Sequence, residues 1–143
     1  MKRLSIYGLI LMSICFISGC GTKLEDYEPK NEQEKEIKGL LIEFTKARND
    51  YNVPGIVSLL ADDCKINIWT RELSKSEFAQ WKAKDLEGSG QYRFTNPEIR
   101  VTDDHAMAKL RCSQGFFVTL AFSFKMIRQN NGWMISEWAS SQN

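Results

Sequence analysis

The sequence has 143 residues, of which 19 are Lys or Arg and 18 are Asp or Glu, so the formal net charge is +1. This near balance excludes the strongly basic composition that nucleic-acid-binding proteins show, and no nucleic-acid partner is expected. The length fits one domain with a hydrophobic core of its own, and no internal repeat is apparent.

The first twenty residues have the organisation of an export signal. Lys2 and Arg3 form a short positive region, and residues 4–17 are apolar apart from small or weakly polar positions. This run is too short for a transmembrane helix with stop-transfer flanks. It ends in Ile-Ser-Gly-Cys at residues 17–20, which resembles the lipobox of bacterial lipoproteins. The alternatives are an ordinary secretory signal with an incidental cysteine, or an uncleaved anchor.

The resemblance implies that residues 1–19 are a signal peptide and that the thiol of Cys20 receives a diacylglycerol. More than one acyl chain attaches a protein stably to a membrane. We therefore expect a palmitate-bearing lipoprotein of the bacterial cell envelope, anchored on the extracytoplasmic side of a membrane. Gly21 is not the aspartate that retains many lipoproteins at the inner membrane, which favours the outer membrane in a cell with two. Loss of the signal leaves 17 basic and 18 acidic residues, a net charge of −1.

The mature chain is predicted to consist of a lipidated cysteine and flexible tether at residues 20–33, followed by a domain at residues 34–143. Residues 21–33 are polar, charged and interrupted by Pro29, a composition typical of linkers. From Glu34, apolar residues recur at spacings of three and four, which predicts a long amphipathic helix. Its apolar residues are Ile37, Leu40, Leu41, Phe44, Ala47 and Tyr51.

A short helix that turns directly into a strand is predicted for residues 55–69. Asn52 precedes this helix as a cap, and Pro54 stands in its first turn. Asp62 and Asp63 are interpreted as turn residues rather than as a paired-carboxylate site. The corner they occupy must pack against the sheet that the strand enters.

A third helix is predicted after a bend at residues 71–73. Ser74 and Glu77 have the spacing of a capping box, and the glycines at residues 88–90 end the helix. Its inward-facing residues are Phe78, Trp81 and Leu86.

Four strands are predicted after residue 91, because apolar and polar residues alternate there. Pro97 suits an edge strand or a bulge, and residues 130–132 (Asn-Asn-Gly) predict a hairpin. The element order favours an α+β domain in which three N-terminal helices pack on a strongly curved, mostly antiparallel sheet. The four strands are residues 92–101, 106–112, 116–127, which is expected at the sheet centre, and 133–138.

The element order, the corner at residues 55–63 and the last strand, Asn-Gly-Trp-Met-Ile at residues 131–135, resemble the nuclear transport factor 2-like (NTF2-like, cystatin-like) superfamily. The similarity is greatest to its ketosteroid isomerase-like and SnoaL-like members and covers about residues 34–140. It implies a cone of helices and bent sheet. The open end of this cone serves as an enzyme site, a small-molecule site or neither.

In isomerase-like members, an aspartate base acts with an oxyanion hole made by a tyrosine and a protonated aspartate. These groups remove a proton beside a carbonyl while the negative charge is held on oxygen. The resemblance places Ile68 at the base, Phe44 at the tyrosine and Phe122 at the second aspartate. None of these side chains transfers a proton, so the sequence argues against this reaction and leans against an enzyme.

The leading interpretation is a non-catalytic domain that binds a small apolar molecule or another protein and needs no cofactor. An apolar pocket would be lined by Phe44, Ile68, Trp81, Leu120 and Phe122, unless these side chains simply fill the cone.

Two other hypotheses belong to different classes. A SnoaL-like enzyme of isomerase, cyclase or hydrolase type would need a non-standard acid or base, for which Asp85 and Tyr92 are the candidates. A homodimer would use the outer face of the long strand, which carries mostly small and weakly polar side chains. The residues of that face are Thr119, Ala121 and Ser123, flanked by Phe117 and Ile127.

Two cysteines, Cys64 and Cys112, remain in the domain. Both fall on the apolar phase of alternating strands, which favours buried free thiols over the disulfide that export would permit. His105 is the only histidine, and ligand residues are not clustered, so no metal site is expected.

Overall fold

The computed structural model describes residues 21–114, 118–130 and 132–142. Within these ranges the chain forms one 3-10 helix, four α-helices and six strands. The helices are η1 (Leu24–Asp26), α1 (Glu32–Asn49), α2 (Val53–Val57), α3 (Lys75–Phe78) and α4 (Ala83–Glu87). The strands are β1 (Leu60–Ile68), β2 (Arg71–Ser74), β3 (Tyr92–Thr102), β4 (His105–Gln114), β5 (Val118–Gln129) and β6 (Gly132–Gln142).

Three features expected from the sequence lie outside the described residues. They are the signal peptide at residues 1–19, the lipidation of Cys20 and the place of Phe117 on the outer strand face. These three stay predictions. Within the described ranges, no helix is long and apolar enough to cross a bilayer.

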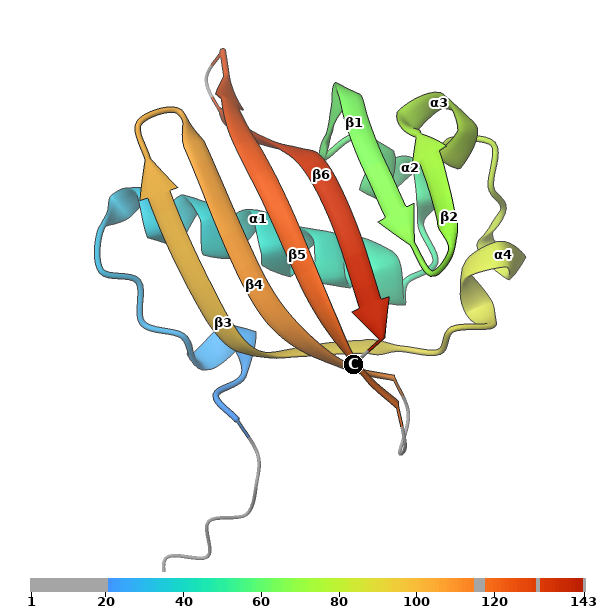
Figure 1. Ribbon diagram of the computed structural model, residues 1–143, viewed down its shortest axis with the longest axis horizontal. Helices are drawn as coiled ribbons and strands as arrows, with labels where there is room; N and C mark the ends of the chain where they lie inside the picture. The colour runs from blue at the N-terminus through green and yellow to red at the C-terminus, as the bar shows by residue number, and fades with distance from the viewer. Residues whose placement is uncertain (1–20, 115–117, 131, 143) are drawn as a thin grey trace, which may run out of the picture.

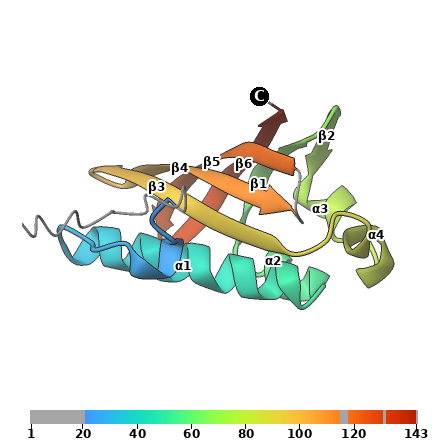
Figure 2. The same cartoon turned by 90° about the horizontal axis from the view of Figure 1, so that it is seen from below.

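The strands form one sheet in the order β2-β1-β6-β5-β4-β3. Neighbouring strands are antiparallel except β1 and β6, which are parallel. The sheet is curved, and α1 crosses one face of it, whereas α3 and α4 lie at the β1–β2 end (Figure 1, Figure 2). The opposite face of β3, β4, β5 and β6 carries no described helix. This arrangement confirms the α+β class and the mostly antiparallel sheet.

Helix α1 is capped at its start and buries one apolar stripe. The Asn31 side chain accepts a hydrogen bond from the Glu34 backbone N–H at 2.8 Å, which satisfies one of the free donors in the first turn. The stripe faces the sheet because residues three and four positions apart share one side of a helix. Its buried apolar residues are Ile37, Leu40, Leu41 and Phe44.

Aromatic rings from four elements meet between α1 and the sheet. Phe44 packs edge-to-face on Trp138 of β6 and on Phe124 of β5, with ring centroids 4.8 and 5.1 Å apart. Phe78 of α3 also contacts Trp138, at 5.5 Å. Such pairs contribute about 0.5–1.5 kcal/mol beyond the area they bury. Trp138 therefore joins the long helix, a short helix and the central strands into one core.

Residues 22–31 pack on the domain, which differs from the flexible tether that the composition predicts. Leu24 is fully buried and belongs to the core. The segment lies along the edge of β3, where the Asn96 N–H donates to the Thr22 carbonyl at 2.7 Å. A single buried leucine has no periodicity, so composition alone does not distinguish this segment from a linker.

Hydrogen bonds around Glu34 hold the same segment to α1. The Glu34 carboxylate accepts from the Lys30 backbone N–H at 2.9 Å and from the Tyr27 hydroxyl at 2.7 Å. The Lys30 N–H and then the Tyr27 hydroxyl hold the pKa of Glu34 below its ordinary value, against the effect of burial. Burial, followed by the neighbouring Glu34, raises the pKa of Tyr27 to about 12.

The helices differ in number and position from the expected three N-terminal ones. Strand β1 precedes α3, as the strand predicted within residues 55–69 implies, but β2 occupies residues that are expected to form a bend. The expected third helix is split, because the Asp85 carboxylate accepts from the Lys82 backbone N–H at 2.7 Å and caps a new helix, α4. The cap of α2 by Asn52 and the capping box of Ser74 and Glu77 are confirmed.

Strand β3 confirms the edge position expected from Pro97. It is the last strand of the sheet, and its pairing with β4 shifts between Thr95 and Glu98. Asn96, inside this shift, has φ of 51°, a left-handed conformation that asparagine tolerates better than most residues. Strand β5 lies between β4 and β6, which agrees with the central place expected for the long strand.

Replacement of Leu24 tests whether the N-terminal segment is part of the fold. Alanine at a fully buried leucine removes apolar surface and leaves a cavity, so we expect Leu24→Ala to lower the free energy of unfolding by about 2–5 kcal/mol. Urea denaturation followed by tryptophan fluorescence measures the difference. Glu28→Ala, at an exposed position of the same segment, should change it by less than about 0.5 kcal/mol. Equal stability of Leu24→Ala and wild type would show that the segment is detached in solution.

The Glu34 carboxylate should stabilise the domain only where it is ionised. Because its folded-state pKa is lowered, its contribution is present above the ordinary value of 4.5 and is lost as the pH falls through the folded value. We expect Glu34→Gln to lower the free energy of unfolding by about 1–3 kcal/mol at neutral pH, and by less in acid. Denaturation at both pH values measures this, with the exposed Glu32→Gln as control. A loss that does not depend on pH would contradict the ionic role.

Candidate functional site

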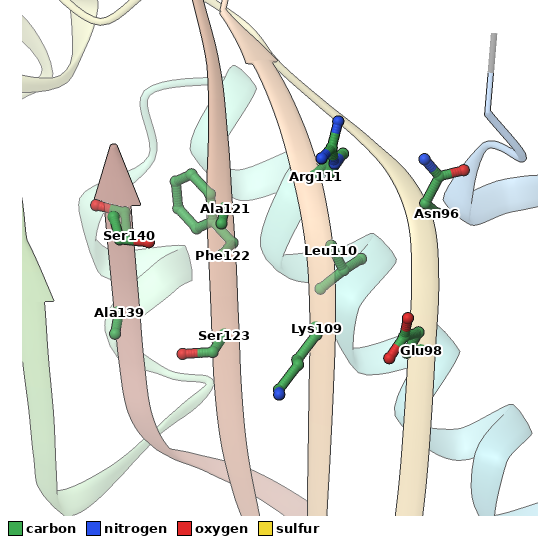
Figure 3. A pocket seen from close by; sticks show the side chains of 11 residues that line it. Asn96, Glu98, Lys109, Leu110, Arg111, Ala121, Phe122, Ser123, Ala139 and Ser140 are labelled. Atoms are coloured by element: carbon green, nitrogen blue, oxygen red, sulfur yellow. The ribbon is translucent and has the colours of Figure 1, made fainter. Parts of the chain in front are cut away.

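A groove of about 690 Å³ lies on the helix-free face of the sheet. Short side chains of β5 and β6 form its floor, and longer polar side chains of β3 and β4 stand beside them (Figure 3). The strand register explains this arrangement, because Glu98, Lys109, Ser123 and Ala139 are successive partners across four strands. Small residues in two central strands thus leave a hollow between longer neighbours.

The lining of the groove combines apolar surface with charged and hydroxyl-bearing side chains, among them unpaired cations. Lys109 and Arg111 are exposed, and neither forms an ion pair with any residue that the structure describes. Ser123 and Ser141 contribute hydroxyl groups, and Glu98 contributes a carboxylate. These groups suit an anionic or polar partner better than an apolar molecule.

The side chains expected to line an apolar pocket face the core on the helix side of the sheet, and Phe122 alone of these five residues is also among those that line the groove. Phe44, Ile68, Leu120 and Phe122 are all buried in the same core cluster. Trp81 is half-buried, with its ring 5.2 Å from that of Phe78.

Aromatic side chains occupy the space around Phe122. Its ring contacts those of Tyr92 and Phe94, with centroids 5.3 Å away in each case, and stacks on Phe124 at 6.2 Å. Ring contacts at these distances belong to a packed core. The interior of the cone is therefore filled here by the chain's own side chains.

Arg48 is a buried charge that the sequence analysis misses. Its side chain is 1% exposed, and its Nη2 donates to the Leu86 carbonyl and the Ser89 hydroxyl, both at 2.9 Å. Nε and Nη1 have no hydrogen-bond partner among the described residues. The residue lies four positions after Phe44, on the apolar stripe of α1, and a cation on such a stripe is the sequence feature that reveals it.

The guanidinium of Arg48 lies over the ring of Tyr92, 4.1 Å from its centroid. A cation over an aromatic face is stabilised by the electron density of the ring. Burial raises the pKa of Tyr92, although Arg48 acts in the opposite direction. The phenol is therefore protonated at neutral pH, where it can donate a proton but not accept one.

Comparison with known sequences finds no match, either to a protein-family model or to a curated protein. Solved structures match most of the chain. An NTF2-like protein from Cytophaga hutchinsonii superposes with a TM-score of 0.65 over 79% of this chain and 99% of its own, at 14% identity. An NTF2-like protein of unknown function from Shewanella oneidensis has a TM-score of 0.64 over 77% and 99%, at 17% identity.

A third similar structure is a putative calcium/calmodulin-dependent protein kinase II association domain from Xanthomonas campestris. It superposes with a TM-score of 0.69 over 85% of this chain and 94% of its own, at 16% identity. The chain has an NTF2-like fold. At these identities the similarity establishes the fold and leaves the activity open.

In this NTF2-like domain, the three positions that the family resemblance links to isomerase chemistry face the core. Phe44 contacts Trp138, Phe122 contacts Tyr92, and Ile68 ends β1 in a buried position. These apolar side chains offer no group that accepts or donates a proton. The geometry gives no support to the isomerase reaction at these positions.

The two alternative acid or base candidates lie in different surroundings. Asp85 is exposed and its carboxylate caps α4, so it faces away from the NTF2-like core. Tyr92 is buried beside Arg48. The structure does not bring the two side chains together, because one caps a surface helix and the other lies inside.

Cys64 and Cys112 are buried free thiols, as the alternation of the strands favours. They lie on β1 and β4 and face the interior. Burial raises the pKa of each thiol to about 12. Because the thiolate is the reactive form, both cysteines are packing residues and not nucleophiles.

Proposed function

We propose that this protein is a lipid-anchored, non-catalytic interaction domain of the bacterial cell envelope, and that it works through the groove on the helix-free face of its sheet. One observation carries the proposal. Rings such as Phe122 and Phe44 fill the interior, whereas a polar groove of about 690 Å³ is open outside. The domain therefore offers its binding chemistry on the sheet face.

Binding of an apolar molecule inside the cone is less well supported. A ligand there would have to displace rings such as Phe122, and full burial of each large apolar side chain stabilises the fold by about 1.5–3 kcal/mol. The whole stability of a domain is typically about 5–15 kcal/mol. Displacing several rings would therefore cancel most of the stability of the domain.

The membrane anchor rests on the sequence. The apolar run of residues 4–17 and the lipobox-like residues 17–20 favour acylation of Cys20. The anchored protein would face the extracytoplasmic side, at the outer membrane where the cell has two.

Lipidation predicts a defined N-terminus and a single modified cysteine. In cells fed an alkyne-tagged fatty acid, the wild-type protein should carry the tag on Cys20 and begin at that residue, as mass spectrometry of the membrane fraction measures. Cys20→Ser should lose the tag, because the acceptor thiol is absent. Cys64→Ala is the control and should keep it. An untagged wild-type protein would overturn the anchor.

A second candidate function is enzymatic, and the buried pair of Arg48 and Tyr92 favours it. A guanidinium with two unpartnered nitrogens beside a protonated phenol has the composition of a site for a small anionic substrate, with Tyr92 as general acid. The exposed position of Asp85 leaves it without a role there.

The non-catalytic proposal predicts that the phenol is dispensable. In a strain that lacks the protein, Tyr92→Phe and Asp85→Asn should restore any phenotype to the wild-type level, because both preserve the packing and remove only the proton-transferring group. Immunoblotting of the membrane fraction confirms equal amounts of each variant. Full loss of complementation by Tyr92→Phe at a normal protein level would favour the enzyme instead.

A further inference from the structure

The N-terminal segment brings Gly21 to the rim of the groove. Gly21 lies so close to the amide of Asn96 that a side chain at position 21 would collide with it. Asn96 itself lines the groove, and its N–H holds the Thr22 carbonyl at 2.7 Å. Cys20 is the next residue along the sequence. A lipid on Cys20 would therefore begin one residue away from the groove.

Exposed basic side chains surround this point. Arg100 on β3 alternates with buried residues, as do Lys109 and Arg111 on β4, so all three project from the helix-free face. We call these three residues the basic face. None of them forms an ion pair with a described residue. Glu98 is the one described acidic residue that projects between them.

We propose that the basic face and the groove bind headgroups of anionic phospholipids in the membrane that holds the anchor, an inference that rests on the proposed lipidation of Cys20. Headgroup phosphates accept hydrogen bonds from Arg and Lys, and the hydroxyls of Ser123 and Ser141 also line the groove. The domain then lies with its helix-free face on the bilayer. Helix α1, on the opposite side of the sheet, faces away from it (Figure 2).

The charge pattern favours a lipid surface over a second copy of the chain. A two-fold interface through this face would place the same surface on both partners. The three unpaired cations of one copy would meet those of the other, with Glu98 and the already paired Glu137 as the facing acids. Like charges brought together across an interface disfavour association. An anionic bilayer presents the opposite charge over the whole face.

The experiment separates the anchor from the orientation. Full-length lipidated protein is mixed with neutral phosphatidylcholine vesicles, and co-sedimentation there tests lipidation alone. Orientation is read in vesicles that contain phosphatidylglycerol, with a headgroup quencher in the bilayer. The fluorophore is placed on Thr119→Cys, an exposed position of β5 outside the groove, or on Glu43→Cys on the exposed side of α1. The buried Cys64 and Cys112 stay unlabelled in the folded protein.

We expect strong quenching for Thr119→Cys and weak quenching for Glu43→Cys, only with the anionic lipid. Adding Lys109→Glu and Arg111→Glu should lower the ratio of docked to undocked protein by more than about twentyfold, because each cation near an anionic surface contributes about fivefold. The pair Lys35→Glu and Lys46→Glu makes the same charge change on α1 and should leave the ratio of docked to undocked protein unchanged.

Three results would overturn the inference. One is equal quenching at both positions, and another is quenching that is unchanged by the Lys109→Glu and Arg111→Glu substitutions. The third is self-quenching of the label at position 119 without vesicles, which would assign the helix-free face to a second copy. Failure to sediment with neutral vesicles would instead reject the anchor, so the two proposals fail separately.

Discussion

Edge-to-face packing around Trp138 is the interaction on which the rest of this domain depends. Phe44 and Phe78 reach Trp138 from two helices, and Phe124 closes the contact from the neighbouring strand. These rings set the distance between α1 and the sheet and occupy the space that the NTF2-like architecture encloses. The same packing that stabilises the fold therefore removes its interior from binding. The groove on the sheet face that no described helix covers stays open for recognition.

Most of the sheet could be predicted from the sequence, because alternation over long strands is a strong pattern and a slip of one residue would bury the charged side chains. The caps at Asn52 and Ser74 could also be predicted, since each depends on residues close by in the sequence. The short elements could not be predicted. β2 has four residues, too few for a pattern, and the segment around Leu24 depends on one side chain that meets a strand about seventy residues away in sequence.

The candidate site could not be predicted either, because it depends on contacts between residues that are distant in the sequence. The sequence identifies Ala121 and Ser123 as outward-facing, but a groove appears only when the register sets them beside Lys109 and Ala139 on other strands. Arg48 was missed because a stripe of apolar residues predicts the face of a helix and not its exceptions. Burial of a cation without a carboxylate is costly. Here the ring of Tyr92, the Leu86 carbonyl and the Ser89 hydroxyl offset part of that cost.

The ordered N-terminal segment changes what an anchor at Cys20 would do. A flexible tether over residues 21–33 would have a root-mean-square span of about 20 Å, enough for the domain to turn any face toward the membrane. Packing of Leu24 and the hydrogen bond from the Asn96 N–H to the Thr22 carbonyl remove this freedom before any lipid contact forms. Contacts between the basic face and headgroups would then form within one molecule, at a high effective concentration. Individually weak interactions suffice under that condition, so a shallow groove on a sheet can act as a membrane-facing site without a deep pocket.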